Sequence, residues 1–353
     1  MKLRYSAALS CALYAAGVAG CRGPQPSAPL PTVVPQTTSQ SQREMPPPAV
    51  KNLYVANDSG SAPSVSVYAT GSSKPLRQIT DGMDGATSLA FDAKGNLYVS
   101  DDANSAIPVY APGAVKRMRT IKNGVDVPVQ VALASSGNVY VANSNGTVTV
   151  YKAGTTTLLQ TIRKGISKQI GAIALDSSGT LYVANWPDTS SGPSWLSEYS
   201  PGQIDPVRTI TVGISFPQVL AFDILNDLYV ANVFGGTVSA YAPTKTKPFM
   251  TISAGLTEPD GLAFDGAGNL YVSDENNNTV TVYGPGSTKL KRTITDGVVQ
   301  PGNLAFGSSR WLNVANAPGD GCGSITEYAP GKSTWGRKIT DQICLPVWIA
   351  FGP

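Results

Sequence analysis

Hydrophobic and polar positions alternate through short segments of residues 51–353, and these segments recur in a fixed order. One unit reads close to Leu-Tyr-Val-Ala-Asn, Thr-Val-Thr-Val-Tyr, Arg-Thr-Ile-Thr and Leu-Ala-Phe-Asp, with Pro-Gly and Gly-Asn turns between segments. Short alternating segments bounded by Gly, Pro and Asn are typical of β-strands. Each unit therefore predicts four strands.

The unit occurs seven times along the chain. Its Leu-Tyr-Val-type triplet begins at Leu53, Leu97, Val139, Leu181, Leu228, Leu270 and Leu312, with spacings of 44, 42, 42, 47, 42 and 42 residues. A period of about 40–50 residues built from strands is typical of β-propeller blades. We therefore expect an all-β fold, a seven-bladed β-propeller of four-stranded blades.

The two ends of the repeat predict how the ring closes. The first unit starts at Lys51 without a Leu-Ala-Phe strand, whereas residues 346–351 form such a strand with nothing after it to pair with. We expect this C-terminal strand to complete the first blade, which removes the open sheet edge at the seam. The propeller domain then spans residues 51–353.

Several residue types occupy fixed columns of the repeat. Every tyrosine after residue 20 lies at one of two positions, which indicates a role in the core. Arginine recurs on the fourth strand of the unit, where charge on an exposed outer strand would oppose edge-to-edge pairing. These arginines are Arg77, Arg119, Arg208, Arg292 and Arg337.

The Gly-Asn-Leu-Tyr-Val-Ala-Asn core of the unit resembles NHL-repeat propellers and related secreted bacterial propellers across residues 51–353. The resemblance implies a propeller and says nothing about an activity. Many NHL modules have six blades, so a count of seven departs from the commonest form.

The N-terminus predicts export. Residues 1–20 combine Lys2 and Arg4 with a short uncharged segment, as a secretory signal does. Val18-Ala19-Gly20-Cys21 resembles a bacterial lipobox, which implies a lipid on Cys21; the alternative is an ordinary signal peptide with an incidental cysteine. Arg22 follows, rather than the Asp linked to inner-membrane retention, so we expect the outer membrane or cell surface. Residues 21–50, rich in Pro, Gln and Ser, predict a disordered tether.

The remaining cysteines of the propeller lie in the last repeat. Cys322 precedes one strand and Cys344 follows its expected antiparallel neighbour. A disulfide between them would suit an exported protein. The alternative is a pair of buried free thiols.

Composition removes several functions. The chain has no histidine, which excludes serine–histidine hydrolysis and His-liganded zinc. It has 26 Lys and Arg against 23 Asp and Glu, a near-neutral balance that argues against a nucleic-acid partner. After residue 20 nothing resembles a membrane-spanning segment.

One end of the predicted ring carries the candidate chemistry. An Asn or Asp follows each Leu-Tyr-Val strand: Asn57, Asp101, Asn143, Asn185, Asn232, Asp274 and Asn316. These side chains either cap the loops that follow them or form a ring of oxygens at the channel mouth. The longest loop follows in blade four, where Asn185, Trp186, Asp188 and Trp195, with Trp348 from the closing strand, form a candidate ligand platform. Alternatively, its aromatic residues merely hold the loop in place.

Two functions remain open. The first is a non-enzymatic binding or scaffold module, lipid-anchored in the bacterial cell envelope, monomeric, needing no cofactor and binding a protein or carbohydrate at the loop face. The alternative is a metal-dependent hydrolase or lactonase, similar to gluconolactonase-type propellers, with Asp101 and Asp274 holding a divalent cation such as calcium.

Overall fold

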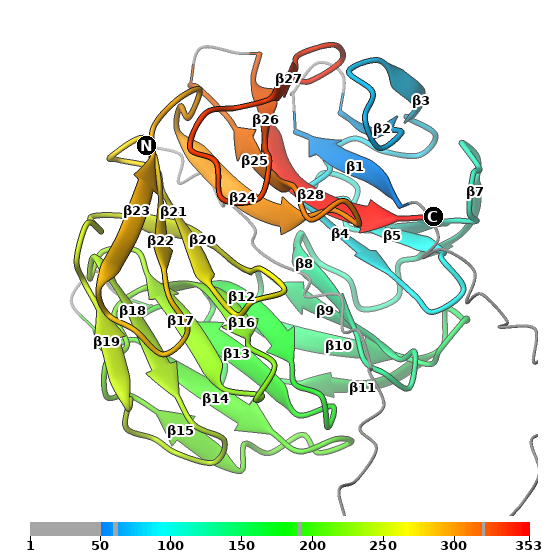
Figure 1. Ribbon diagram of the computed structural model, residues 1–353. Helices are drawn as coiled ribbons and strands as arrows, with labels where there is room; N and C mark the ends of the chain where they lie inside the picture. The colour runs from blue at the N-terminus through cyan, green and yellow to red at the C-terminus, as the bar shows by residue number, and fades with distance from the viewer. Residues whose placement is uncertain (1–50, 59–62, 189–191, 320–321) are drawn as a thin grey trace, which may run out of the picture.

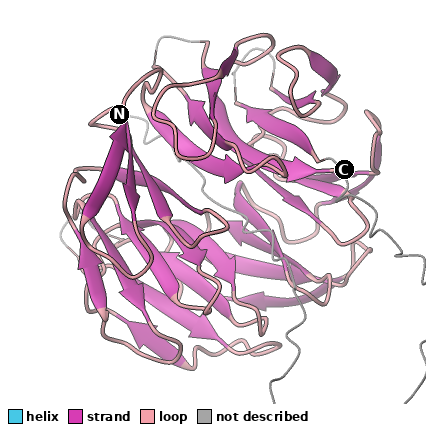
Figure 2. Ribbon diagram, in the orientation of Figure 1, coloured by secondary structure: helices cyan, strands magenta, loops and turns pink. Residues whose placement is uncertain are grey.

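The computed structural model describes residues 51–58, 63–188, 192–319 and 322–353. Every regular element in these ranges is a β-strand (Figure 2). The strands form seven four-stranded antiparallel sheets, arranged as the blades of a ring (Figure 1). The predicted seven-bladed all-β propeller is therefore confirmed. The predicted signal peptide (1–20), tether (21–50) and lipid site Cys21 lie outside the described residues.

Each blade has an inner strand and a second strand, which pair through the Leu-Ala-Phe and Leu-Tyr-Val segments. From blade 1 to blade 7, the inner strands are β28 (Pro346–Gly352), β4 (Ser88–Phe91), β8 (Pro128–Leu133), β12 (Ile170–Leu175), β16 (Pro217–Phe222), β20 (Pro259–Phe264) and β24 (Pro301–Phe306). The second strands are β1 (Asn52–Asn57), β5 (Leu97–Ser100), β9 (Val139–Asn143), β13 (Leu181–Asn185), β17 (Leu228–Asn232), β21 (Leu270–Asp274) and β25 (Leu312–Asn316).

A third and an outer strand complete each blade. The third strands are β2 (Ser64–Tyr68), β6 (Ile107–Tyr110), β10 (Thr147–Tyr151), β14 (Trp195–Tyr199), β18 (Thr237–Tyr241), β22 (Thr279–Tyr283) and β26 (Ser324–Tyr328). The outer strands are β3 (Pro75–Ile79), β7 (Arg117–Ile121), β11 (Leu158–Ile162), β15 (Arg208–Ile210), β19 (Met250–Ile252), β23 (Leu290–Ile294) and β27 (Arg337–Ile339).

The ring closes through the C-terminal strand, as predicted. Strand β28 pairs antiparallel with β1, with Leu53 opposite Phe351, so blade 1 combines both ends of the repeat. The hydroxyl of Tyr54 also donates a hydrogen bond to the carbonyl of Pro353, at 2.5 Å. Figure 1 shows β28 and β1 side by side. The closure therefore gives β1 a hydrogen-bonded neighbour on both sides, β28 and β2.

The hydrophobic core lies between neighbouring blades. One cluster joins Val148 and Ile162 of blade 3 to Ile173 and Val183 of blade 4. Four further clusters each join two successive blades, and the largest cluster contains both the junction of blades 1 and 2 and that of blades 5 and 6. Because each blade covers the apolar face of the next, stability depends on the complete ring.

Tyrosines at the end of the third strands tie the blades together. In all seven blades the tyrosine hydroxyl donates to a carbonyl in the crossover that leaves the preceding blade. The pairs are Tyr68–Asp341, Tyr110–Asp81, Tyr151–Asn123, Tyr199–Lys164, Tyr241–Val212, Tyr283–Ala254 and Tyr328–Asp296. The tyrosine column is thus a set of contacts between blades, which explains its regularity.

The arginine column is half-buried rather than directed to solvent. Arg77, Arg119 and Arg292 reach across their blades and donate to the hydroxyls of second-strand tyrosines. Arg208 and Arg337 instead form ion pairs with glutamates on the third strand. The expectation of exposed charges was wrong because each guanidinium folds back over its own blade, onto a second-strand tyrosine or a third-strand glutamate.

Candidate functional site

The two ends of the propeller differ in what they carry. We call the end where the second strands finish the loop face; it holds the loops to the third strands and the crossovers between blades. The opposite end is the turn face, where each inner strand turns into its second strand.

The Asn and Asp column lies at the loop face, and every member is buried, with at most 1% of its surface exposed. In each case a side-chain oxygen accepts a backbone N–H from the crossover that arrives from the preceding blade. The donors are Cys344, Asp84, Asp126, Ser167, Ser215, Thr257 and Val299, in blade order. The column therefore fixes crossovers and presents no ring of free oxygens.

The two acidic members of the column have additional partners. Asp101 also accepts hydrogen bonds from the backbone and side chain of Asn104, and Asp274 from the backbone of Asn277. Burial raises the pKa of Asp101 above its usual range, although hydrogen bonds to the carboxylate oppose this shift. Across the described residues, no three His, Cys, Asp or Glu side chains lie close enough together to hold a metal ion.

The blade-four loop is held against the preceding crossover. Asp188 accepts hydrogen bonds from the Ser167 hydroxyl (2.8 Å) and the Lys168 amide (3.0 Å), and these lower the pKa of Asp188. Trp195 is half-buried, and its indole N–H donates to the Gly165 carbonyl at 3.0 Å. Residues 189–191 of this loop lie outside the described part of the chain.

The other two tryptophans of the expected platform are buried. Trp348 is fully enclosed, in the cluster that joins blade 1 to blade 2. Trp186 is 6% exposed, and its indole N–H donates to the Pro217 carbonyl at 2.8 Å. Neither side chain offers a face to solvent, so a ligand would have to meet other residues.

Trp186 instead supports an aromatic stack between blades 4 and 5. Its ring packs against Phe216 (centroids 5.6 Å apart), and Phe216 packs edge-on against Phe234 at 4.8 Å. Phe234 is 60% exposed at the loop face. Sequence reasoning missed Phe216 and Phe234, although both are aromatic at positions where the other repeats carry varied residues.

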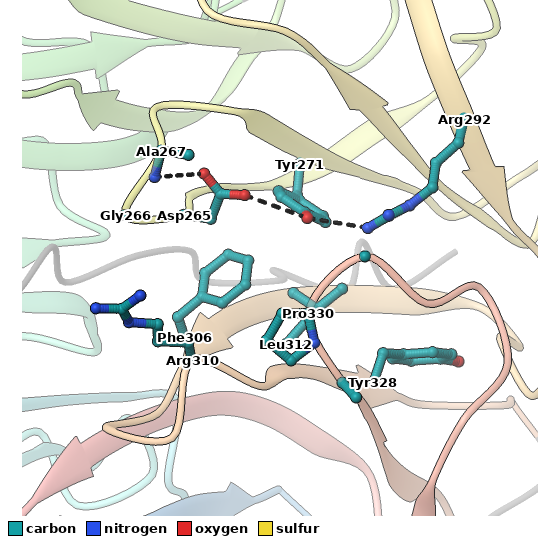
Figure 3. Close-up of a pocket in the computed structure, with 12 residues that line it drawn as sticks. Asp265, Gly266, Ala267, Tyr271, Arg292, Phe306, Arg310, Leu312, Tyr328 and Pro330 are labelled. Carbon is teal, nitrogen blue, oxygen red and sulfur yellow. Dashed lines mark hydrogen bonds between the residues drawn. The ribbon is translucent and has the colours of Figure 1, made fainter.

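A cleft of about 220 Å³ lies at the turn face, between blades 6 and 7 (Figure 3). It is bounded by two turns, the β20–β21 turn and the β26–β27 turn, with the aromatic rings of Tyr271, Phe306 and Tyr328 along its walls. Figure 3 places Arg292 and Arg310 at opposite ends, with Phe306 and Leu312 between them. The walls of the cleft are thus mainly apolar and its ends are cationic.

A chain of polar groups crosses one wall of the cleft. The Asp265 carboxylate accepts backbone N–H bonds from Ala267 and Asn269 within its own turn, both at 2.9 Å. Tyr271 lies 3.4 Å from the other carboxylate oxygen and accepts a hydrogen bond from Arg292 at 3.0 Å. Burial raises the pKa of Tyr271, which is therefore a neutral phenol at neutral pH.

Arg310 differs from its counterparts in the other repeats. It occupies the left-handed position of the β24–β25 turn, with φ of 62°. Glycine or asparagine stands at this position in the turns that join the other inner and second strands: Gly95, Gly137, Gly179, Asn226 and Gly268. The sequence contains this difference, because Arg310 interrupts a column of glycines and one asparagine at this turn position.

The two cysteines of blade 7 are adjacent. Their sulfur atoms lie 2.6 Å apart, and both residues are free thiols in the structure. The backbone N–H of Cys344 also donates a hydrogen bond to the side-chain oxygen of Asn57 in blade 1. The pair therefore lies beside the crossover into the closing strand.

Comparison with known proteins supports the fold. The NHL repeat family matches residues 256–283, which contain the first three strands of blade 6. A functionally unknown protein from Desulfotomaculum acetoxidans is similar in structure, with a TM-score of 0.68 and 14% identity over 86% of this chain and 99% of that chain. The WD40 β-propeller domain of Doa1 has a TM-score of 0.63 and 15% identity over 82% of this chain and 92% of that one. No curated protein matches the chain in sequence.

The chain is therefore a seven-bladed β-propeller that contains an NHL repeat. At these identities the solved structures establish the fold alone. The part of the chain described by the structure has no helix long and apolar enough to cross a bilayer.

Proposed function

We propose that this protein is a non-enzymatic binding module, anchored in a bacterial cell envelope by a lipid on Cys21 and tethered by residues 22–50. The propeller is monomeric, and its loop face meets a partner at the outer membrane or cell surface. The observation that carries the binding role is the stack of Trp186, Phe216 and Phe234, because it ends in an exposed ring.

The stack has the properties of a binding anchor. Phe234 is exposed, yet its ring is held by Phe216, which is held in turn by the buried Trp186. A rigid aromatic side chain loses little conformational entropy on binding, which is why such residues dominate protein interfaces. Gly235 and Gly236 follow, so the two residues after Phe234 add no polar side chains of their own. These features favour a protein partner over a carbohydrate.

The hydrolase or lactonase alternative has no observation in its favour. Asp101 and Asp274 are buried, and their oxygens accept backbone N–H groups that hold the crossovers and loops. A calcium site needs about six to eight oxygen ligands around an accessible ion. Recruiting these carboxylates would break the bonds that position the loop face.

We also propose that Cys322 and Cys344 form a disulfide after export, through exchange with an oxidised thiol-disulfide partner of the envelope. Their sulfur atoms are already adjacent. The bond would link the β25–β26 loop of blade 7 to the crossover that leads into the closing strand of blade 1.

Anchoring is tested with the full chain produced in a bacterium that processes lipoproteins. The wild-type protein should incorporate a palmitate analogue and sediment with membranes, whereas Cys21→Ser should do neither. Labelling of the Cys21→Ser variant, or an unlabelled wild-type protein, would reject the lipid anchor.

Partner binding is tested by placing a photo-cross-linking amino acid at position 234 and, as a matched control, at position 224. Ile224 is 92% exposed in the β16–β17 turn, at the opposite end of the same blade. We expect a discrete protease-sensitive adduct in cells from position 234 and none from position 224. Equal adducts at both positions, none at either, or a protease-resistant adduct at position 234 would contradict a protein partner at the stack.

A further inference from the structure

The cleft between blades 6 and 7 lies at the turn face, at the other end of the propeller from Phe234. None of the residues discussed at the loop face lines it. A function for this cleft therefore goes beyond the proposed function and does not depend on it.

Most polar groups of the cleft are already engaged. Asp265 caps its own turn, and Arg292 lies over the Tyr271 ring, with the guanidinium carbon 5.6 Å from the centroid and a hydrogen bond to the hydroxyl. These groups form a fixed wall. A ligand would gain little by displacing them.

Arg310 is the group that is not engaged. Its side chain is exposed, and within the described residues its guanidinium forms no hydrogen bond or ion pair. It stands in a turn where glycine or asparagine would adopt the same backbone conformation more readily. A strained, unpaired arginine at the mouth of a cleft is poorly explained by folding alone.

We infer that this cleft binds a small organic monoanion through a carboxylate that pairs with Arg310. The apolar body of the ligand packs against Phe306 and Leu312, between the two cationic ends. Arginine binds carboxylates with two parallel hydrogen bonds, which provides both orientation and charge recognition.

Charge and volume narrow the class of ligand. Two arginines and one aspartate line the cleft, a net charge of plus one, which is complementary to a monoanion rather than to a phosphate dianion. The cleft volume of about 220 Å³ lies below the ~300–1,000 Å³ of pockets that hold drug-sized ligands. The ligand is therefore a small acid, or the last residue of a peptide with its terminal carboxylate.

The test uses calorimetric titration of residues 51–353, which contain all the strands of the closed ring. The probes are benzoate for a free acid, N-acetylglycinate for a peptide terminus, benzamide as the neutral counterpart of benzoate, and phenyl phosphate as a dianion. We expect benzoate or N-acetylglycinate to bind, and benzamide and phenyl phosphate to bind at least tenfold more weakly. The tighter of the two carboxylates identifies the source.

Arg310→Gly should weaken carboxylate binding at least tenfold without lowering the melting temperature, because glycine occupies this turn position in four sister blades. Lys94→Ser, which removes a cation from the equivalent turn of blade 2, should leave the affinity unchanged. The inference is overturned if neither carboxylate binds, if benzamide binds as well as benzoate, if phenyl phosphate binds more tightly, or if Arg310→Gly keeps its affinity.

Discussion

The junction between blades 2 and 3 and the junction between blades 6 and 7 contain the same chain of polar groups. In the first, Tyr98 lies 3.4 Å from Asp92 and accepts a bond from Arg119 at 2.7 Å. In the second, Asp265, Tyr271 and Arg292 repeat this arrangement with distances of 3.4 and 3.0 Å.

The two junctions differ at one turn position of the following blade. In blade 3 this position is Gly137, and a Cβ built there would lie 3.1 Å from the Cβ of Ala153. In blade 7 it is Arg310, which lines the cleft together with Pro330. The repeated residues therefore build the junction, whereas a single departure from the repeat supplies a charge that has no partner among the described residues.

The largest expected effect tests whether the shared chain is structural at both junctions. Tyr98 and Tyr271 are 0% and 4% exposed. Replacing either with Ala should lower the free energy of unfolding by about 3–5 kcal/mol, the usual loss for a large aromatic side chain in a core. Guanidinium denaturation measures the free energy of unfolding of both variants. A loss at Tyr271 below half that at Tyr98 would show that the cleft has already loosened the second junction.

A smaller effect concerns the third-strand tyrosines of blades 3 and 7, which bond to the crossovers that leave blades 2 and 6. Tyr151 and Tyr328 donate to the carbonyls of Asn123 and Asp296, at 2.8 and 2.6 Å. Tyr151→Phe and Tyr328→Phe should each cost about 1 kcal/mol at neutral pH. If only one variant loses stability, the two junctions are not equivalent in this contact.

The same tyrosines make the free energy of unfolding depend on pH in the alkaline range. Burial raises the pKa of Tyr328 to about 12 and raises that of Tyr151 above its usual value. Between pH 10 and the folded pKa, the unfolded chain binds fewer protons than the folded chain, so stability falls as pH rises. This contribution is fully present below pH 10. Denaturation at pH 9 and pH 11 should show a smaller loss for Tyr328→Phe than for the wild type.

Replacements at the turn position should change stability with opposite signs at the two junctions. Arg310→Gly should stabilise the protein by about 1 kcal/mol, because glycine adopts the left-handed turn without steric cost. Gly137→Arg should destabilise it by about 1–2 kcal/mol, because φ is 82° and Ala153 is close. Melting temperatures of the two variants and the wild type measure these changes. A lower melting temperature for Arg310→Gly would mean that the arginine supports the fold.

The columns of the repeat were sufficient to predict the architecture. The spacing of the Leu-Tyr-Val triplets gave the number of blades, and the unpaired strand at residues 346–351 gave the closure. The period-two pattern specifies strands, and the repetition forces them into equivalent blades. The burial of both tyrosine columns followed from the same reasoning.

Side-chain direction was harder to predict. Trp348 occupies a strand position whose side chain points into the neighbouring blade, so its proximity to the loop face did not expose it. The Asn and Asp column caps the crossover arriving from the preceding blade, a contact such as Ser215 with Asn232, which lie 17 positions apart in the chain. Such contacts depend on how one blade rotates against the next, which no local pattern encodes.

Closure by β28 also has a consequence for the order of events during synthesis. Strands β1, β2 and β3 leave the ribosome first, yet their sheet lacks its inner member until residues 346–352 arrive. Until then, the Tyr54 hydroxyl lacks its hydrogen bond to the Pro353 carbonyl. One edge of β1 is also unpaired and can form hydrogen bonds with strands of other chains. The first blade to be made is thus the last to be finished, and its unpaired strand edge must be protected from aggregation until almost the whole chain has been synthesised.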